Sequence, residues 1–489
     1  MLSKVLLTGL AFLAFGLAKF VYNLLVYRGF SPTFLGEINQ VLSVFLLVPL
    51  FYAPGLGTVV SKFAAEFLGS KEPHKAKQVF CLSFVLVAVA SVVCTIITLA
   101  IFPYLKGRME VERGTVAALA PMLVLYGLYT FLRSSYYGFD RVPLYLRNEV
   151  VSSAIFFVVL AAAVVARSRL LVVLPFVAHS ATFAAIAIHD LRDQFSFRTM
   201  LSGIAPQLRR YGHFFFCTVV NSLAGPGAFY LGIILTGRVT GDKALVGQYS
   251  LVLYSLQALN LLPMSLLNVM MPTISHHYGA GRTREGVEVA ERAFRPLFLL
   301  MTLIWGGGMI LGWEAVQAVS GGATTQLTLV FEVMLFAAYF LLISTAPGVL
   351  LNATEYIGVI AWGAAVSFVM AIAVWWGALP AYGLLGSAAG YAVLQVTKGV
   401  WSFVAARRIF QWRARVGWTT VLTIPVIVAL GMVSLRSESR WFHTAIAILF
   451  VGLFLVFHAR TIQSYMAQLI AEVRSFAPGL VRPSDGEGC

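Results

Sequence analysis

Long apolar runs, separated by short stretches of charged and turn-forming residues, dominate the pattern of this chain. A run of about 20 apolar residues is long enough for an α-helix to cross the hydrocarbon core of a bilayer. The pattern predicts fourteen such spans, at residues 5–27, 39–61, 79–102, 115–132, 150–166, 170–188, 212–237, 245–271, 296–318, 327–351, 357–376, 383–405, 418–435 and 441–458. The predicted fold class is therefore an all-α polytopic membrane protein.

Composition agrees with this prediction and excludes a large water-soluble enzyme. Of the 489 residues, 59% are hydrophobic and only 11% are charged, and the mean hydropathy is +0.85. Soluble domains carry about 25% charged residues. Fourteen spans leave room for short loops and ends, and for no large domain outside the membrane.

The charge balance is strongly basic, with a formal net charge of +15. Most of the Lys and Arg residues flank the predicted spans, and more than twice as many fall on the side of the N-terminus as on the other side. Cytoplasmic loops are enriched in these residues, so we expect an even number of spans with both termini in the cytoplasm. The charge is assigned to orientation and to anionic membrane lipids, not to nucleic acid.

A weak internal repeat relates the two halves of the chain. Gly36 and Gly247 each open a span that leads to a turn and a charged run, at an offset of about 211 residues. Because an even number of spans separates the copies, the repeat is parallel, and such repeats form two lobes with a cavity between them. We expect a pseudo-symmetric pair of six-helix lobes at residues 1–195 and 196–415, an appended helix pair at 416–460 and a cytoplasmic tail at 461–489.

The first predicted span contains a cation near its middle. A lysine there costs about 2.5–3.5 kcal/mol unless it faces water, a partner or a ligand. At helical spacing, one face of the span carries Gly9, Phe12, Gly16, Lys19 and Asn23. Lys19 and Asn23 are therefore candidate ligands for a phosphate-bearing substrate. The alternatives are that Lys19 snorkels to the interface or pairs with Glu332.

Three further cations are candidate substrate-binding residues. Arg28 and Arg133 lie at ends of predicted spans and could equally anchor lipid headgroups, whereas Lys398 lies within a span and could snorkel. Spans one, two, seven and eight contain no carboxylate well inside the predicted helix. A pump for cationic drugs needs acidic residues in its cavity, so these charges favour an anionic substrate.

Two features point to coupling and movement. Glu332 lies well inside a predicted helix, where a carboxyl group can titrate, so it is the ion-coupling candidate; a structural ion pair is the alternative. Gly225, Pro226 and Gly227 interrupt span seven and are the predicted hinge. Pro49 and Pro54 in span two and Pro263 in span eight predict further breaks.

The chain lacks the usual signatures of enzymes and metal sites. It contains no Walker A sequence and no HExxH motif, and its histidines have no triad partner in the sequence. Cys81, Cys94, Cys217 and Cys489 form neither CxxC pairs nor metal-ligand spacing. We therefore expect no enzyme activity, no metal and no cofactor.

Several soft motifs, in this order and spacing, resemble the MATE-like superfamily of multidrug, oligosaccharidyl-lipid and polysaccharide exporters, and especially its O-antigen-type flippases. The motifs are residues 30–36, residues 55–57 followed by 62–66, and residues 246–250, 271–275 and 379–388. Such flippases often carry an Asp in span seven, where this chain has the uncharged residues 229–232. A role of that Asp does not carry over.

The resemblance implies a flippase that moves an undecaprenyl-pyrophosphate-linked oligosaccharide across a bacterial inner membrane by alternating access. Its partners would be the lipid-linked oligosaccharide, membrane lipids and a polysaccharide polymerase. An H⁺ or Na⁺ gradient, or consumption of the product outside, would supply the energy. The alternatives are a lipid II flippase, a multidrug or cation antiporter of the same superfamily, and a membrane enzyme that polymerises or ligates glycans.

Overall fold

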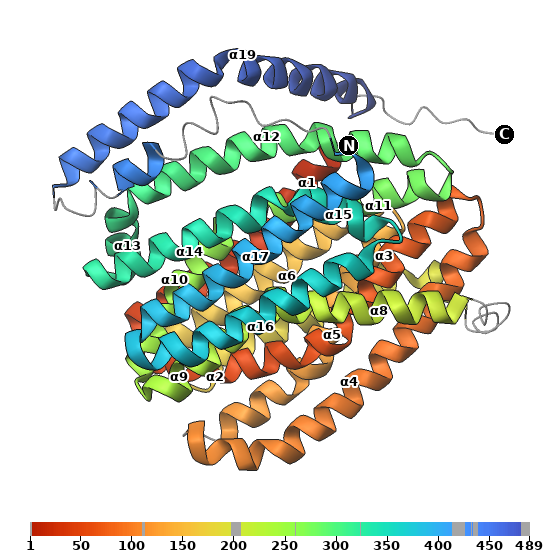
Figure 1. The fold of residues 1–489 in the computed structure, drawn as a ribbon. Helices are drawn as coiled ribbons and strands as arrows, with labels where there is room; N and C mark the ends of the chain where they lie inside the picture. Colours follow the sequence, from red (N-terminus) through yellow and green to blue (C-terminus); the bar gives the residue numbers. More distant parts are fainter. Residues whose placement is uncertain are drawn as a thin grey trace.

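A computed structural model describes residues 2–109, 113–196, 207–259, 261–322, 324–412, 426–431, 433 and 439–480. Within these residues every regular element is a helix (Figure 1). The predicted span 418–435 and the predicted tail 461–489 lie partly outside the described residues. Cys489 and the expected boundary between residues 415 and 416 lie wholly outside them.

Seven α-helices make up the first half of the fold. They are α1 (Leu2–Gly29), α2 (Pro32–Leu47), α3 (Ala53–Gly69), α4 (Pro73–Met109), α5 (Arg113–Gly138), α6 (Val142–Val165) and α7 (Leu174–Asp190), with the short 3₁₀ helices η1 (Val48–Phe51), η2 (Leu171–Val173) and η3 (Arg192–Gln194) between or after them. The start of α2 shows which local interactions make a helix begin at this position. The Ser31 side chain accepts a hydrogen bond from the Phe34 amide, and Pro32 follows as the first helical residue.

The second half continues with α8 (Leu208–Ser222), the π-helix η6 (Leu223–Gly227), α9 (Ala228–Thr240), α10 (Lys243–Leu259), α11 (Leu261–Gly279), α12 (Thr283–Ile310), α13 (Gly312–Ser320), α14 (Thr325–Ile343), α15 (Thr345–Ala353), α16 (Ile357–Tyr382) and α17 (Leu384–Phe410). Helix α19 (Arg440–Leu480) packs on α12 and extends beyond the predicted span that ends at residue 458.

Two predicted breaks are present in the helices. Span two is divided by η1, which contains Pro49, and Pro54 lies in the first turn of α3. Span seven is divided by the π-helix η6, which contains Pro226. A proline removes one backbone N–H from the helical ladder, and this explains why regular α-helix ends there. In span eight, the junction between α10 and α11 falls on residue 260, which lies outside the described residues.

The predicted fold class, an all-α polytopic membrane protein, is confirmed. Within the described residues, ten helices are long and apolar enough to cross a membrane, or eleven if the bent pair α13–α14 counts as one span. The predicted number of fourteen is not confirmed. Part of the difference between the two numbers arises where a predicted span is broken into shorter helices. Helices α3 and α10 have only 17 residues each, which is too short to be counted among the ten.

The two halves meet where α2 lies along α10 and α3 lies along α11. We call the end of the bundle at which α1 begins the near end, and the opposite end the far end; in Figure 1, α3, α8 and α11 reach toward the right and α2, α9 and α13 toward the left. Gly36 packs on the Lys243 carbonyl and Gly247 on the Pro32 carbonyl at the far end. At the near end, Gly279 packs on the Glu66 carbonyl.

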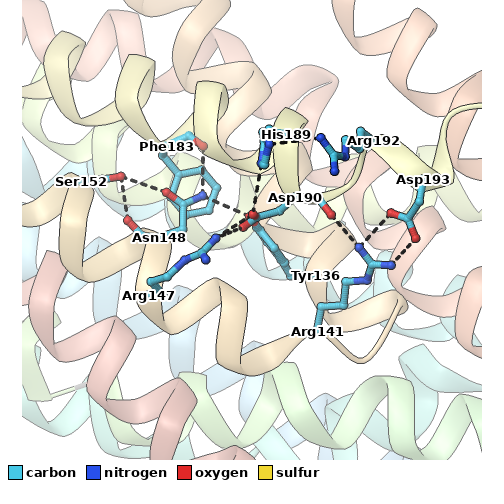
Figure 2. A network of polar contacts seen from close by, with 10 residues as sticks. All are labelled: Tyr136, Arg141, Arg147, Asn148, Ser152, Phe183, His189, Asp190, Arg192 and Asp193. Carbon is cyan, nitrogen blue, oxygen red and sulfur yellow. Dashed lines mark hydrogen bonds and ion pairs between the residues drawn. The ribbon is translucent and has the colours of Figure 1, made fainter. Parts of the chain in front are cut away.

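A polar network secures the near end of the first half (Figure 2). Asp190 accepts hydrogen bonds from Arg147 at 2.6 Å and from the Tyr136 hydroxyl at 2.9 Å. Arg141 donates to the Asp190 carbonyl at 2.6 Å and pairs with Asp193. The hydrogen bonds that Arg141 donates to the Asp193 carboxylate hold the pKa of Asp193 below its usual range. The network fixes α5, α6 and α7 relative to one another.

Candidate functional site

A cavity of about 410 Å³ lies between the two halves of the fold. Side chains from α1 and α5 of the first half face side chains from α8 to α10 and α14 to α17 of the second half. A volume of this size is within the range of small-molecule sites, about 300–1,000 Å³. The residues that line the cavity are Phe12, Phe15, Gly16, Lys19, Arg133, Asn221, Ser222, Gly225, Pro226, Phe229, Tyr254, Gln257, Leu341, Ser344, Thr345, Gly348, Asn352, Ile360, Tyr391, Gln395, Lys398 and Ser402.

All charged side chains among the described residues that line this cavity are positive. Lys19 and Arg133 contribute from the first half and Lys398 from the second, and none of these lining residues is Asp or Glu. Three of the five predicted substrate-binding residues are thus brought together, although α1, α5 and α17 are far apart in the sequence. Amides and hydroxyls on the same wall provide neutral hydrogen-bonding groups.

Lys19 is a half-buried cation on the cavity wall. Its Nζ lies 4.3 Å from the centre of the Phe15 ring and 5.9 Å from that of Tyr126. Aromatic faces stabilise an ammonium group but do not neutralise its charge. Within the described residues no carboxylate forms an ion pair with Lys19, so the alternative pairing with Glu332 is not found. The ammonium remains available to an anion in the cavity.

Lys398 faces the break in span seven. Its Nζ lies 3.5 Å from the Asn221 carbonyl, in the turn that precedes η6. A methyl group added at Gly225 would lie 3.5 Å from the same Nζ. Because Pro226 lacks an N–H, the π-helix leaves a backbone carbonyl without its usual donor. The predicted hinge and a predicted cationic ligand therefore contact each other on one wall.

Arg133 connects the cavity to a buried pair that the sequence analysis missed. Arg133 donates to the Tyr129 hydroxyl at 3.4 Å, and this hydroxyl donates to Glu149 Oε1 at 3.2 Å. His179 Nε2 lies 3.3 Å from the same oxygen, and both Glu149 and His179 are fully buried. Glu149 directly precedes the predicted span 150–166, and His179 has no partner nearby in sequence. Only packing of α6 on α7 brings them together.

The other two predicted substrate-binding residues do not line the cavity. Asn23 is buried, donates to the Lys19 carbonyl at 2.8 Å and accepts from Asn39 at 2.7 Å. Asn39 also donates to Ser250 at 2.8 Å, so Asn23 belongs to the contact between α1, α2 and α10. Arg28 is exposed at the far end of α1 and donates to the Ala318 carbonyl. Asn23 lies one turn further toward the far end than Lys19, which places it beyond the cavity.

Glu332 is buried but stands apart from the cavity. Only 4% of its surface is exposed, and a methyl group added at Gly312, the first residue of α13, would lie 3.1 Å from its Oε1 atom. The amino end of a helix favours a negative charge. Within the described residues no cation pairs with Glu332. An ion-coupling role for Glu332 stays a prediction, and any coupling to the cationic cavity would be indirect.

The described residues contain no group of three or more His, Cys, Asp or Glu side chains that could hold a metal ion. What the cavity offers is a set of fixed positive charges, aromatic faces such as Phe229 and Tyr391, and amides such as Asn352 and Gln395. This combination can bind an anion that also carries hydroxyl groups, since charge-assisted hydrogen bonds are the strongest polar contacts available.

No model of a known protein family matches the chain, and no curated protein sequence matches it. Solved structures do. A mutant of the MATE transporter VcmN from Vibrio cholerae is 15% identical, with a TM-score of 0.66 over 84% of this chain and 97% of that chain. A MATE transporter in its bent conformation is 13% identical, with a TM-score of 0.66 over 88% and 96%.

A third solved structure is a MOP superfamily transporter from Pyrococcus furiosus, described by the reversed polarity of its binding pocket. It is 13% identical, with a TM-score of 0.67 over 83% of this chain and 95% of that chain. The chain therefore has the fold of MATE and MOP superfamily transporters, across nearly the whole length of those proteins.

Proposed function

We propose that this chain, built on a transporter fold, exports a lipid-linked oligosaccharide whose lipid and sugar are joined by a pyrophosphate. The observation that carries the proposal is the cationic lining of the central cavity, with Lys19 and Arg133 on one side and Lys398 on the other. The pyrophosphate would lie among these cations, and the sugar would lie against the amides and aromatic rings. The lipid tail would remain in the bilayer.

Electrostatics favours this class of substrate over a cationic drug. Three cations with no acidic lining residue among those described repel a cationic ligand, and the low dielectric of the membrane interior strengthens that repulsion. A pyrophosphate instead replaces the water that the cations lose. Lys19 suits a phosphate as a compact point charge, whereas Arg133 can bind two oxygens at once.

The proposed setting is a bacterial inner membrane with both chain termini in the cytoplasm. A polysaccharide polymerase on the outer side would consume the product, and an H⁺ or Na⁺ gradient is the alternative source of energy. Glu332 is the candidate for ion coupling. Asn23 and Arg28, which lie outside the cavity, would serve the substrate only at a later stage of transport.

The proposal is tested by translocation in liposomes that contain the purified protein. A fluorescent polyprenyl-diphosphate-linked N-acetylglucosamine is the probe, and its loss from the inner leaflet is the readout. Lys19→Ala should abolish translocation, Lys19→Arg should retain part of it, and Lys398→Gln should weaken probe binding by about ten-fold, equivalent to about 1.4 kcal/mol. Arg284→Gln, an exposed charge on α12 with a side chain 55% accessible, is the matched control.

Each rival predicts a different result in the same liposomes. Full translocation by Lys19→Ala at normal protein level would remove the proposed role of Lys19. Transport of ethidium but not of the diphosphate probe would support a multidrug antiporter, and preference for lipid II would support a lipid II flippase. A chemically altered probe would indicate a glycan-polymerising enzyme. A deletion strain that accumulates a lipid-linked sugar would identify the natural substrate.

A further inference from the structure

Four charged residues join the two halves of the fold at the near end. Arg210 of α8 forms an ion pair with Glu66 of α3, with nitrogen–oxygen distances of 2.8 and 3.0 Å, and a second ion pair with Glu355, between α15 and α16. Lys62 of α3 lies 3.7 Å from the same Glu355 carboxylate. We call Lys62, Glu66, Arg210 and Glu355 the near-end cluster.

Lys62 is the most constrained member of this cluster. Its side chain is fully buried, and its Nζ donates to the Thr354 carbonyl at 2.7 Å. The same Nζ lies 4.6 Å from the centre of the Phe214 ring. A buried ammonium needs such partners, because an unpaired charge there would be costly. Lys62 of the first half is therefore satisfied by residues of the second half.

Glu355 is held in its charged form by this arrangement. Partial burial by itself raises its pKa, but the hydrogen bond from Arg210 and the charge of Lys62 outweigh burial and hold the pKa below its usual range. The side chain of Glu355 is 47% exposed, so water reaches the cluster. A charged cluster in contact with water can separate at much lower cost than one enclosed by hydrocarbon.

The cluster lies next to the cavity. Thr354 and Glu355 directly follow α15, whose residues Thr345, Gly348 and Asn352 line the cavity. Arg210 belongs to α8, which carries the lining residues Asn221 and Ser222 at its other end. Movement of α3 away from α8 and α15 would therefore separate the cluster beside these cavity-lining elements.

The far end has a smaller counterpart. Lys243 of α10 pairs with Glu37 of α2 at 2.9 Å, and both side chains are about one quarter exposed. The glycine contacts between the halves occur at both ends, whereas the large charged cluster occurs at the near end alone among the described residues. The two ends are alike in their glycine packing, and the near end in addition holds the fully buried ammonium group of Lys62.

We propose that the near-end cluster is an ionic latch, which holds the two halves together at the near end of the bundle and separates when the cavity opens to that end. The inference rests on the proposed function only in that transport requires such an opening. A purely structural cluster would affect folding but would leave accessibility of the cavity from the near side unchanged.

The latch is tested without any substrate, by one-sided labelling of a single cysteine. In a variant with Cys81, Cys94, Cys217 and Cys489 replaced by serine, Gln257→Cys places a thiol on the cavity wall. A negatively charged, membrane-impermeant methanethiosulfonate is applied from one side of oriented membrane vesicles. The labelling rate from each side measures how often the cavity opens to that side.

Glu66→Gln combined with Glu355→Gln should raise the near-side labelling rate by about ten-fold, as expected for a loss of about 1.4 kcal/mol from the closed state. Arg210→Glu should do the same. Glu66→Arg together with Arg210→Glu should bring the rate back toward that of the parent, because an opposite-charge pair across the halves is restored. Glu37→Gln is the matched control, and it should raise far-side labelling alone.

An unchanged near-side rate in the Glu66→Gln and Glu355→Gln variant would overturn the latch, as would an equal near-side increase in Glu37→Gln. If Arg210→Glu fails to fold, the neutral Gln variants still decide the question. Because the assay contains no oligosaccharide, a failed latch leaves the proposed substrate untouched, and a failed translocation assay leaves the latch untouched.

Discussion

Glu149 and His179 illustrate how a pair of residues without any sequence signal becomes prominent in three dimensions. Both are fully buried, and His179 stacks on Phe15 of α1 with ring centres 3.8 Å apart. The Oε2 atom of Glu149 has no hydrogen-bond partner within the described residues. Through Tyr129, the pair supports Arg133 on the cavity wall. We therefore infer that this pair holds the Arg133 side chain in place.

Replacement of Glu149 by alanine should destabilise the protein by about 3 kcal/mol, because it leaves the buried Tyr129 hydroxyl without its acceptor and removes the carboxylate that lies 3.3 Å from buried His179. Glu149→Gln retains an oxygen for Tyr129 and should cost only about 1 kcal/mol. The thermal unfolding midpoint of the purified protein in detergent measures both. Equal midpoints for the Ala and Gln variants would contradict the role of this oxygen.

The π-helix η6 is the most distinctive single element of the fold. Pro226 prevents one α-helical hydrogen bond, and Lys398 Nζ lies within 3.5 Å of the Asn221 carbonyl in the preceding turn. π-bulges are often found at functional sites. The element couples the shape of span seven to the position of a cation in the cavity, so a change in one should change the other.

Pro226→Ala should lower the transport rate while protein levels stay normal, because the new N–H can complete the helix and withdraw a carbonyl from Lys398. Gly225→Ala should also slow transport, by stiffening the bend, since its methyl group meets Lys398 Nζ at an ordinary contact distance of 3.5 Å. Gly212→Ala in α8, where no atom lies within 4 Å, is the control. Normal rates in both variants would mean that the bend is only structural.

At the scale of the whole molecule, equivalent glycines of the weak repeat meet each other. Gly36 and Gly247 lie at the contact of α2 with α10, and Asn39 bonds to Ser250, which is 211 residues further along the chain. The offset between these bonded residues matches the offset read from the sequence. The contact allows two helix backbones to approach closely, as small residues do in membrane proteins.

Gly36→Ala and Gly247→Ala should each weaken this contact. Their methyl groups would lie 1.9 Å from the Lys243 carbonyl oxygen and 2.1 Å from the Pro32 carbonyl oxygen, so the backbones must move apart. We expect a loss of about 1–3 kcal/mol, the usual cost of overpacking, seen as a lower unfolding midpoint. Gly29→Ala, with no atom within 4 Å, should be unaffected. If Gly36→Ala leaves the unfolding midpoint unchanged, the two helix backbones can move apart at little cost in stability.

Sequence alone determined the class of this protein. Apolar run length, low charge content and proline positions depend on local chemistry, and they correctly predicted an all-helical membrane protein with breaks at η1 and η6. The predicted number of spans is not confirmed, and the same local signals do not distinguish a broken span such as α2 and α3 from two shorter helices, because both have the same composition. Lys19 could be singled out because a cation inside an apolar run is costly wherever the run packs.

Tertiary structure decided which charges share a space. Lys19, Arg133 and Lys398 line one cavity, whereas Asn23 and Arg28, on the same helix as Lys19, do not, because a helix displays successive turns to different neighbours. The pairing of Glu149 with His179 and the near-end cluster join residues from separate helices. Such contacts depend on which helices pack together, and that choice is made by the summed packing of many side chains.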